Sequence, residues 1–236
     1  MTTELYLENS YLKECESQIE SVDGNLVILE QTIFYPGGGG QPCDKGFIKQ
    51  GNTIYEVVKV TKKDGKIIHV LDRPLKETSP VTLQIDWSWR YQNMRYHTLL
   101  HVISGYLYQH YNGLATSSQI EKDHSRLEIT FSAEIIDKIP FEQLEQSIKE
   151  LLKQSYTVST KIITKEEAEQ KEGIIKTTVS LLPPSLKKIR IVQIQGIDEQ
   201  ACGGTHVHNT SEIGDFSIIK IQNKGATKRR IKLQLN

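Results

Sequence analysis

The chain has 236 residues, of which 29 are lysine or arginine and 29 are aspartate or glutamate, so its formal net charge is zero. This balance argues against a nucleic-acid binder that depends on a basic tail, although it leaves room for a local basic patch. The apolar fraction of 37% is typical of a soluble globular protein. No stretch approaches the roughly 20 apolar residues of a membrane span, so we expect no membrane partner.

The compartment follows from the start of the chain and from its cysteines. The first ten residues contain neither the basic region nor the apolar run of a signal peptide. The chain has three cysteines, Cys15, Cys43 and Cys202, and a number that is both small and odd argues against a disulfide framework. We therefore expect a cytoplasmic protein with reduced thiols.

Short strands are predicted throughout the first part of the chain. Asp64-Gly65 lies between two apolar runs and predicts a hairpin turn. The predicted strands cover residues 26–30, 47–50, 53–61, 67–71 and 81–85. We expect residues 1–87 to form a small β-rich domain.

The pattern changes at about Trp87, where helical periodicity begins. A long helix is predicted from Arg90 to Tyr111, because Asn112-Gly113 is a good C-terminal stop. Pro140 opens a second predicted helix, and Thr164 with Glu167 forms a capping box before a short helix that ends at Gly173. Strands are predicted at 127–131, 189–194, 216–222 and 229–235. Residues 88–236 thus predict an α+β domain with helices against a mainly antiparallel sheet, in which 173–185 is a loop or an inserted subdomain.

Two short motifs carry metal-binding side chains. His97-Thr-Leu-Leu-His101 places two imidazoles one helical turn apart, where they could hold one ion; alternatively, each histidine has a separate partner. Cys202-Gly-Gly-Thr-His206 has the same spacing on a glycine-rich turn, and its plain alternative is a buried thiol. Together they indicate one tetrahedral zinc, with His208 as a possible substitute for His206.

A glycine-rich segment and a basic segment are the remaining candidates. The segment 34–44 contains Gly37, Gly38, Gly39 and Gly40, and either cradles a phosphate or polar chain end or forms a long hairpin turn. The C-terminal run either grips a phosphate backbone or is a solvated strand edge. Its basic residues are Lys220, Lys224, Lys228, Arg229, Arg230 and Lys232.

The order of these motifs resembles a known family. The motifs are Thr32-x-Phe34-Tyr35 with Gly-Gly-Gly-Gln41, Arg90-x-x-x-Met94-Arg95-x-His97-x-x-x-His101, Cys202-x-x-x-His206 with Thr210-x-x-Ile213-Gly214, and Gly225 before Arg229-Arg230-Ile231. The chain resembles the editing domain of alanyl-tRNA synthetases and its free-standing AlaX relatives. The glycine-rich motif matches the medium-length type, and Cys43 is one departure from the expected pattern.

This resemblance implies a function and a fold. The function is hydrolysis of mischarged tRNA(Ala), carrying serine first and glycine as a second candidate, with one zinc held by His97, His101, Cys202 and His206. The fold is a β-barrel-like domain at 1–87 joined to an editing core at 88–236, which is shared with threonyl-tRNA synthetases.

Other residues receive expected roles from the same resemblance. Thr32 would read the serine hydroxyl, unless it is an ordinary strand threonine, and Gln41 and Gln119 would orient the substrate or water. Arg229 and Arg230, with Lys228, would hold acceptor-stem phosphates. The competing hypothesis is a zinc-containing tRNA-binding module without turnover. A zinc hydrolase of a small ester is a third, against which the basic strand counts.

Overall fold

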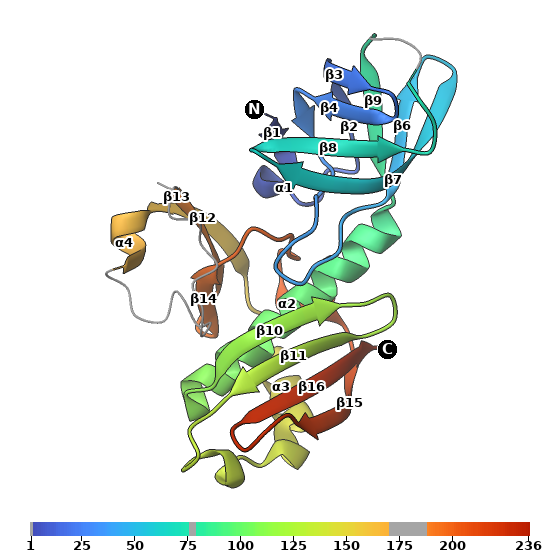
Figure 1. The fold of residues 1–236 in the computed structure, drawn as a ribbon. Coiled ribbons are helices and arrows are strands. Elements are labelled where there is room, and N and C mark those ends of the chain that lie inside the picture. Colours follow the sequence, from blue (N-terminus) through green and yellow to red (C-terminus); the bar gives the residue numbers. More distant parts are fainter. Residues whose placement is uncertain (1, 76–78, 170–187) are drawn as a thin grey trace. The chain divides into compact units, whose positions relative to one another are not determined.

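The computed structural model describes residues 2–75, 79–169 and 188–236, which form two compact units, Met1–Met94 and Arg95–Asn236 (Figure 1). The division falls within helix α2 (Trp87–Tyr111), which contributes its first residues to one unit and the rest to the other. The domain boundary between residues 87 and 88 stays a prediction. Among the described helices, none combines the length and the apolar character needed to cross a bilayer.

The first unit is an open, curled antiparallel sheet of seven strands. In spatial order they are β2 (Glu14–Ser17), β9 (Val81–Ile85), β6 (Gly46–Gln50), β7 (Thr53–Lys63), β8 (Lys66–Leu71), β4 (Leu26–Leu29) and β3 (Ile19–Asp23). A parallel pair, β1 (Thr3–Glu4) with β5 (Gln31–Thr32), and helix α1 (Leu5–Glu8) complete it. Alternate residues such as Val27, Ile48 and Leu83 are buried, which gives the sheet one apolar face.

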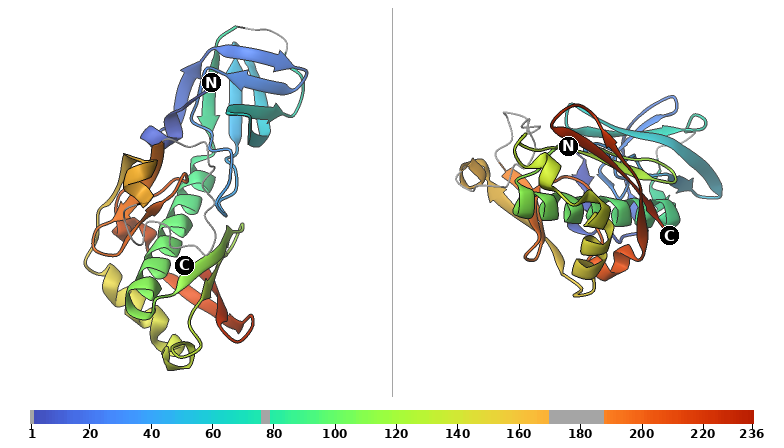
Figure 2. Two further views of the ribbon diagram at one scale, coloured as in Figure 1. Left: turned by 60° about the vertical axis from the view of Figure 1, so that its left-hand side comes forward. Right: turned by 90° about the horizontal axis from the view of Figure 1, so that it is seen from below.

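The second unit places α2 between two antiparallel sheets (Figure 2). The larger sheet has the order β10 (Leu114–Ile120), β11 (Ser125–Thr130), β16 (Lys228–Leu235) and β15 (Phe216–Asn223). The smaller has the order β12 (Val158–Thr164), β13 (Lys188–Ile194) and β14 (Asp198–Ala201). Its helices are α3 (Leu144–Leu152) and α4 (Lys165–Glu169), with 3-10 turns at Ile136–Lys138, Phe141–Gln143 and Thr210–Ile213.

The predicted α+β class is confirmed, and so are two local signals. Asp64 and Gly65 both have positive φ, 51° and 76°, as the predicted two-residue hairpin between β7 and β8 requires. In the Thr164–Glu167 capping box, Glu167 N–H donates to the Thr164 hydroxyl over 3.2 Å, while Thr164 N–H donates to the Glu167 carboxylate over 2.8 Å. The predicted end of that helix at Gly173 and the segment 173–185 lie outside the described residues.

Two helix starts differ from the prediction for local reasons. Helix α2 begins at Trp87 rather than Arg90, because the Asp86 carboxylate accepts a hydrogen bond from Trp89 N–H over 3.1 Å and caps the first turn. The helix expected at Pro140 begins as a 3-10 turn, and α3 proper starts at Leu144. Strands β10 and β12 were not predicted, because their sequences carry several serine and threonine residues and little apolar alternation.

Candidate metal centre

The two sequence motifs with metal-binding side chains meet in the second unit. Helix α2 carries His97 and His101 on one face, Cys202 follows β14 directly, and His206 lies four residues further along. One potential ligand atom from each of the four lies within 4.8 Å of all the others. His208 is exposed and does not belong to this group, so His206 is the histidine that joins it.

The separations and the donor types can be tested against zinc. The Cys202 sulfur lies 3.6 Å from His97 Nε2 and 3.4 Å from His206 Nε2. Tetrahedral zinc, with Zn–N near 2.0 to 2.1 Å and Zn–S near 2.3 Å, holds nitrogen and sulfur ligands about 3.6 Å apart. Three imidazoles and one thiolate are soft donors that calcium and magnesium do not choose. The residues present therefore fit a zinc ion.

The electrostatics favour a thiolate at this centre. Burial raises the pKa of Cys202, but the charges of His97 and His206 and hydrogen bonds from His101 and His206 outweigh it and hold that pKa well below its usual value. Burial and the charge of His97 lower the pKa of His206. Gly204 N–H also donates to the Cys202 sulfur over 3.3 Å. A thiolate and a neutral imidazole are the forms that bind a metal.

Hydrogen bonds from outside the cluster orient two of the imidazoles. The Asp198 carboxylate lies 2.9 Å from His101 Nδ1, and the Thr98 hydroxyl lies 3.1 Å from His206 Nδ1. Both bonds use Nδ1, so Nε2 is the atom that could bind a metal. The Gln200 amide also contacts the His101 ring, 2.9 Å from Nδ1 and 3.2 Å from Nε2. Sequence reasoning missed these residues, although Thr98 lies inside the first motif.

The same face of α2 docks the turn that carries Asp198. Gly105 follows His101 by four residues, and a Cβ there would lie 2.5 Å from Ile197 O and 2.9 Å from Asp198 Cβ. Four residues further on, the Gln109 amide donates to the carbonyls of Gly196 and Ile197 over 3.0 and 2.9 Å. Gly105 is therefore required for the close approach that brings Asp198 to His101.

The glycine-rich segment of the first unit forms a tight hairpin. Gly38 and Gln41 exchange two backbone hydrogen bonds of 3.0 Å, and Gly39 and Gly40 between them have φ of 57° and 86°. Gln41 is buried. A Cβ at Gly37, whose φ is 82°, would lie 3.1 Å from Cys43 N, so the backbone at Cys43 packs closely on the hairpin. The turn expected as one alternative is present, and the phosphate cradle stays a prediction.

A buried ion pair fixes both ends of this segment. Arg90 and Asp44 have fully buried side chains and form an ion pair. Arg90 also donates to Ser10 O over 2.9 Å and to Ile33 O over 2.6 Å, while Asp44 accepts from Tyr35 N–H over 2.6 Å. The ion pair therefore ties the residues before the glycines to those after them.

Thr32 is fully buried and takes part in a chain of hydrogen bonds. His69 Nδ1 lies 3.2 Å from Val27 O, and a carbonyl can only accept, so Nδ1 carries the proton. Burial lowers the pKa of His69 to about 4, so its Nε2 is an acceptor and the Thr32 hydroxyl donates to it over 2.8 Å. Phe34 N–H donates to the same hydroxyl over 3.1 Å. Thr32 therefore has acceptor capacity left but no proton to donate.

The structure separates the residues expected to bind phosphate. Arg229 pairs with Ile129, which is fully buried, so Arg229 lies on the core face of the larger sheet, with its guanidinium 5.9 Å from the Phe141 ring centre. Lys228 and Arg230 lie on the opposite face, where Arg230 donates to Glu128 over 2.8 Å. On the same sheet, the Gln119 amide oxygen accepts a hydrogen bond from Arg126.

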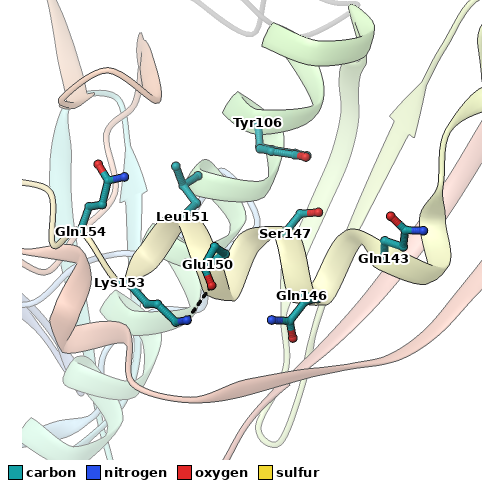
Figure 3. A pocket seen from close by; sticks show the side chains of 8 residues that line it. All are labelled: Tyr106, Gln143, Gln146, Ser147, Glu150, Leu151, Lys153 and Gln154. Atoms are coloured by element: carbon teal, nitrogen blue, oxygen red, sulfur yellow. Dashed lines mark hydrogen bonds and ion pairs between the residues drawn. The ribbon is translucent and has the colours of Figure 1, made fainter.

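A shallow hollow of about 640 Å³ lies elsewhere in the second unit, along α3 (Figure 3). Tyr106 of α2 and seven residues at 143–154 line it, and Lys153 pairs there with Glu150. It shares no residue with the four-ligand cluster. Its lining lacks histidine and cysteine and carries one neutralised ion pair, so it offers no chemistry comparable to the cluster.

Comparisons with known proteins identify related chains. Residues 5–89 match the family described as tRNA synthetases class II (A), and residues 189–232 match the family described as threonyl and alanyl tRNA synthetase second additional domain. The alanyl-tRNA editing protein AlaX-M of Methanosarcina barkeri is 38% identical over 98% of both chains. That of Saccharolobus solfataricus is 36% identical, also over 98% of both. The alanine–tRNA ligase of Aeropyrum pernix is 34% identical over 92% of this chain but only 24% of its own length.

Proposed function

This chain belongs to the AlaX-M family of alanyl-tRNA editing proteins, and from that premise we propose that it hydrolyses the ester of mischarged tRNA(Ala). The single observation that carries the proposal is the convergence of His97, His101, Cys202 and His206 on one point. Serine is the amino acid that we propose is removed, and glycine is the second candidate. The tRNA is the proposed partner.

We propose that zinc is the ion of the four-ligand cluster. Three imidazole nitrogens and the Cys202 thiolate would hold it, and the sulfur–nitrogen separations of 3.4 and 3.6 Å suit it. When bound, zinc supplies Lewis acidity if a coordination position opens, and rigidity if all four ligands stay. Asp198 and Thr98 keep His101 and His206 in the tautomer that presents Nε2.

We propose that Thr32 is the residue that distinguishes a seryl group from an alanyl group. Because its own proton is donated to His69, the Thr32 oxygen can only accept, and the hydroxyl of a seryl group can donate to it. Alanine lacks that hydroxyl and would leave the buried oxygen with one bond fewer, which is the kind of difference that gives strong discrimination. Gln41, Gln119 and the backbone of Gly37 to Gly40 stay candidates for holding the substrate, with the Gln119 oxygen already engaged by Arg126.

The test is deacylation of Ser-tRNA(Ala) and Ala-tRNA(Ala), measured side by side. The native protein should release serine and spare alanine, and Cys202→Ala should lose both bound zinc and activity. Cys15→Ala is the matched control, because that thiol lies in the first unit and outside the cluster. It should keep zinc and activity.

Two outcomes would overturn the proposal. A zinc-loaded, folded protein that releases neither serine nor glycine from tRNA(Ala), but binds the tRNA, would be the binding module without turnover. Equal release of serine and alanine would contradict the proposed role of Thr32 in selecting serine. Thr32→Val should lower the rate on Ser-tRNA(Ala) relative to Ala-tRNA(Ala) if the hydroxyl is read as proposed.

A further inference from the structure

The larger sheet of the second unit has two faces of opposite character. Residues that pair directly across antiparallel strands point to the same side. Leu127 pairs with Ile231 and both are buried, whereas the neighbouring pair Arg126 and Lys232 points to the other side. Helices α2 and α3 lie behind this sheet in Figure 1, on the side of the buried residues. The opposite side of β10, β11, β16 and β15 carries no described helix of this unit.

That opposite side has a strong excess of positive charge. We call it the basic face and define it by Arg126, Lys220, Lys228, Arg230 and Lys232, which the strand register places together. Glu128 is the acidic residue among them, and Arg230 already donates to it. The hydrogen bond from Arg230 lowers the pKa of Glu128, and the charges of Lys228 and Arg126 add to this effect against its partial burial.

Three of these cations lie side by side on neighbouring strands, where their mutual repulsion lowers the stability of the sheet. Lys232 lies directly between Arg126 on β11 and Lys220 on β15. Like charges directly opposite each other on neighbouring strands destabilise a sheet. Strands lie about 4.8 Å apart, so the row spans about 10 Å. Among the described residues, none provides a carboxylate partner for Lys220 or Lys232. A polyanion laid along the row would relieve the repulsion.

We propose that the basic face binds the phosphate backbone of the tRNA, with Arg126, Lys220 and Lys232 as its central contacts. This inference rests on the proposed function, from which the tRNA comes. The outward positions of these four strands hold no aromatic side chain on which a base could stack, so the contact is to phosphates rather than bases. Arg229 lies on the other face and has no part in it.

The test is equilibrium binding of uncharged tRNA(Ala), which needs no hydrolysis, at salt concentrations from about 50 to 200 mM. The double variant Lys220→Gln/Lys232→Gln should bind more weakly, by roughly tenfold per charge near 0.1 M salt, and its log–log salt slope should fall by about two. Adding Arg126→Gln should lower the slope by about one more. Lys153→Gln, at the C-cap of α3, is the matched control and should bind like the native protein.

The readouts separate this inference from the proposed function. The double variant relieves a like-charge pair, so its melting temperature should stay the same or rise, and weak binding cannot then be ascribed to unfolding. An unchanged affinity and slope in a folded double variant would overturn the inference, as would an equal loss in Lys153→Gln. Tight, face-dependent binding of tRNA without serine release would overturn only the proposed deacylation.

Discussion

Two buried polar clusters of this molecule differ in the kinds of atom that they bring together. In the first unit, all three guanidinium nitrogens of Arg90 donate, to Asp44 and to two backbone carbonyls, and Asp44 also accepts from Tyr35. In the second unit, three imidazoles and a thiolate bring electron-pair donors together within 4.8 Å. The first cluster pairs a cation with a carboxylate and with carbonyl oxygens, whereas the second gathers nitrogen and sulfur atoms of the types that bind metal ions.

This difference indicates which cluster is structural and which is a candidate metal site. Nitrogen and sulfur atoms of these types, gathered this closely, are the set of ligands that a zinc site uses. Asp44 with Arg90 needs nothing further and holds the glycine-rich hairpin in place. His97, His101, Cys202 and His206 could hold a metal ion.

Breaking the first cluster should have the largest effect on stability. Asp44→Ala leaves the Arg90 charge buried without its carboxylate, and we expect the free energy of unfolding to fall by about 3 to 5 kcal/mol. Urea titration followed by tryptophan fluorescence can measure this, because Trp89 donates to Cys43 O beside the hairpin. Asp23→Ala, at an exposed position of β3, is the control. A loss no larger than that of the control would show that the ion pair is not structural.

His69 extends the comparison to a buried group that titrates. Its pKa is lowered from 6.5 to about 4 by burial, so the unfolded chain takes up a proton first as the pH falls. Above pH 6.5 the imidazole is neutral in both the folded and the unfolded chain, and its titration costs no stability. As the pH falls from 6.5 towards 4, the free energy of unfolding should fall by about 3 kcal/mol. Unfolding free energies of the native protein and His69→Leu, compared at pH 7 and pH 4, check this. The native protein should lose more stability on acidification than the variant, and equal losses would refute the assignment.

Metal withdrawal tests the second cluster directly. If zinc at a hundred times its dissociation constant is present, we expect about 2.7 kcal/mol of stabilisation that a chelator removes. Calorimetry with and without chelator should show the shift in the native protein and none in Cys202→Ala. An equal response of both proteins would mean that the metal binds elsewhere.

The groups that orient the ligands should have the smallest effect. Asp198→Asn should weaken zinc binding ten- to a hundredfold, or about 1 to 3 kcal/mol, because His101 loses the carboxylate at Nδ1. Gly105→Ala should act in the same direction by pushing Asp198 away. Competition with a chelating dye measures the affinity, and the exposed Asp137→Asn is the control. Native affinity in both variants would exclude the orienting role.

The sequence was informative where local chemistry decides the structure. The hairpin at Asp64-Gly65 and the capping box at Thr164 are set by neighbouring residues, and both were predicted. The four candidate ligands could be named from the sequence because two of them lie four residues apart on a helix and two lie four residues apart on a glycine-rich turn.

Other features depend on contacts between distant segments and left no local pattern. Asp198 meets His101 across 97 positions of sequence, and Arg90 meets Asp44 across 46. The separation of Arg229 from Arg230 follows from strand alternation, but the role of each face appears only once Ile129 is seen opposite Arg229. A count of basic residues could not distinguish the two.

The spacing of residues along helix α2 fixes the geometry of the candidate metal centre. Four residues of α2 follow one another at intervals of four: His97, His101, Gly105 and Gln109. The two histidines are candidate metal ligands, Gly105 leaves room for the turn that carries Asp198, and the Gln109 amide donates a hydrogen bond to that turn. One residue inserted after His101 would rotate everything beyond it by about 100° and turn Gly105 and Gln109 away from Asp198. In related chains, insertions and deletions should therefore fall outside this stretch of the helix, even where its other positions change freely.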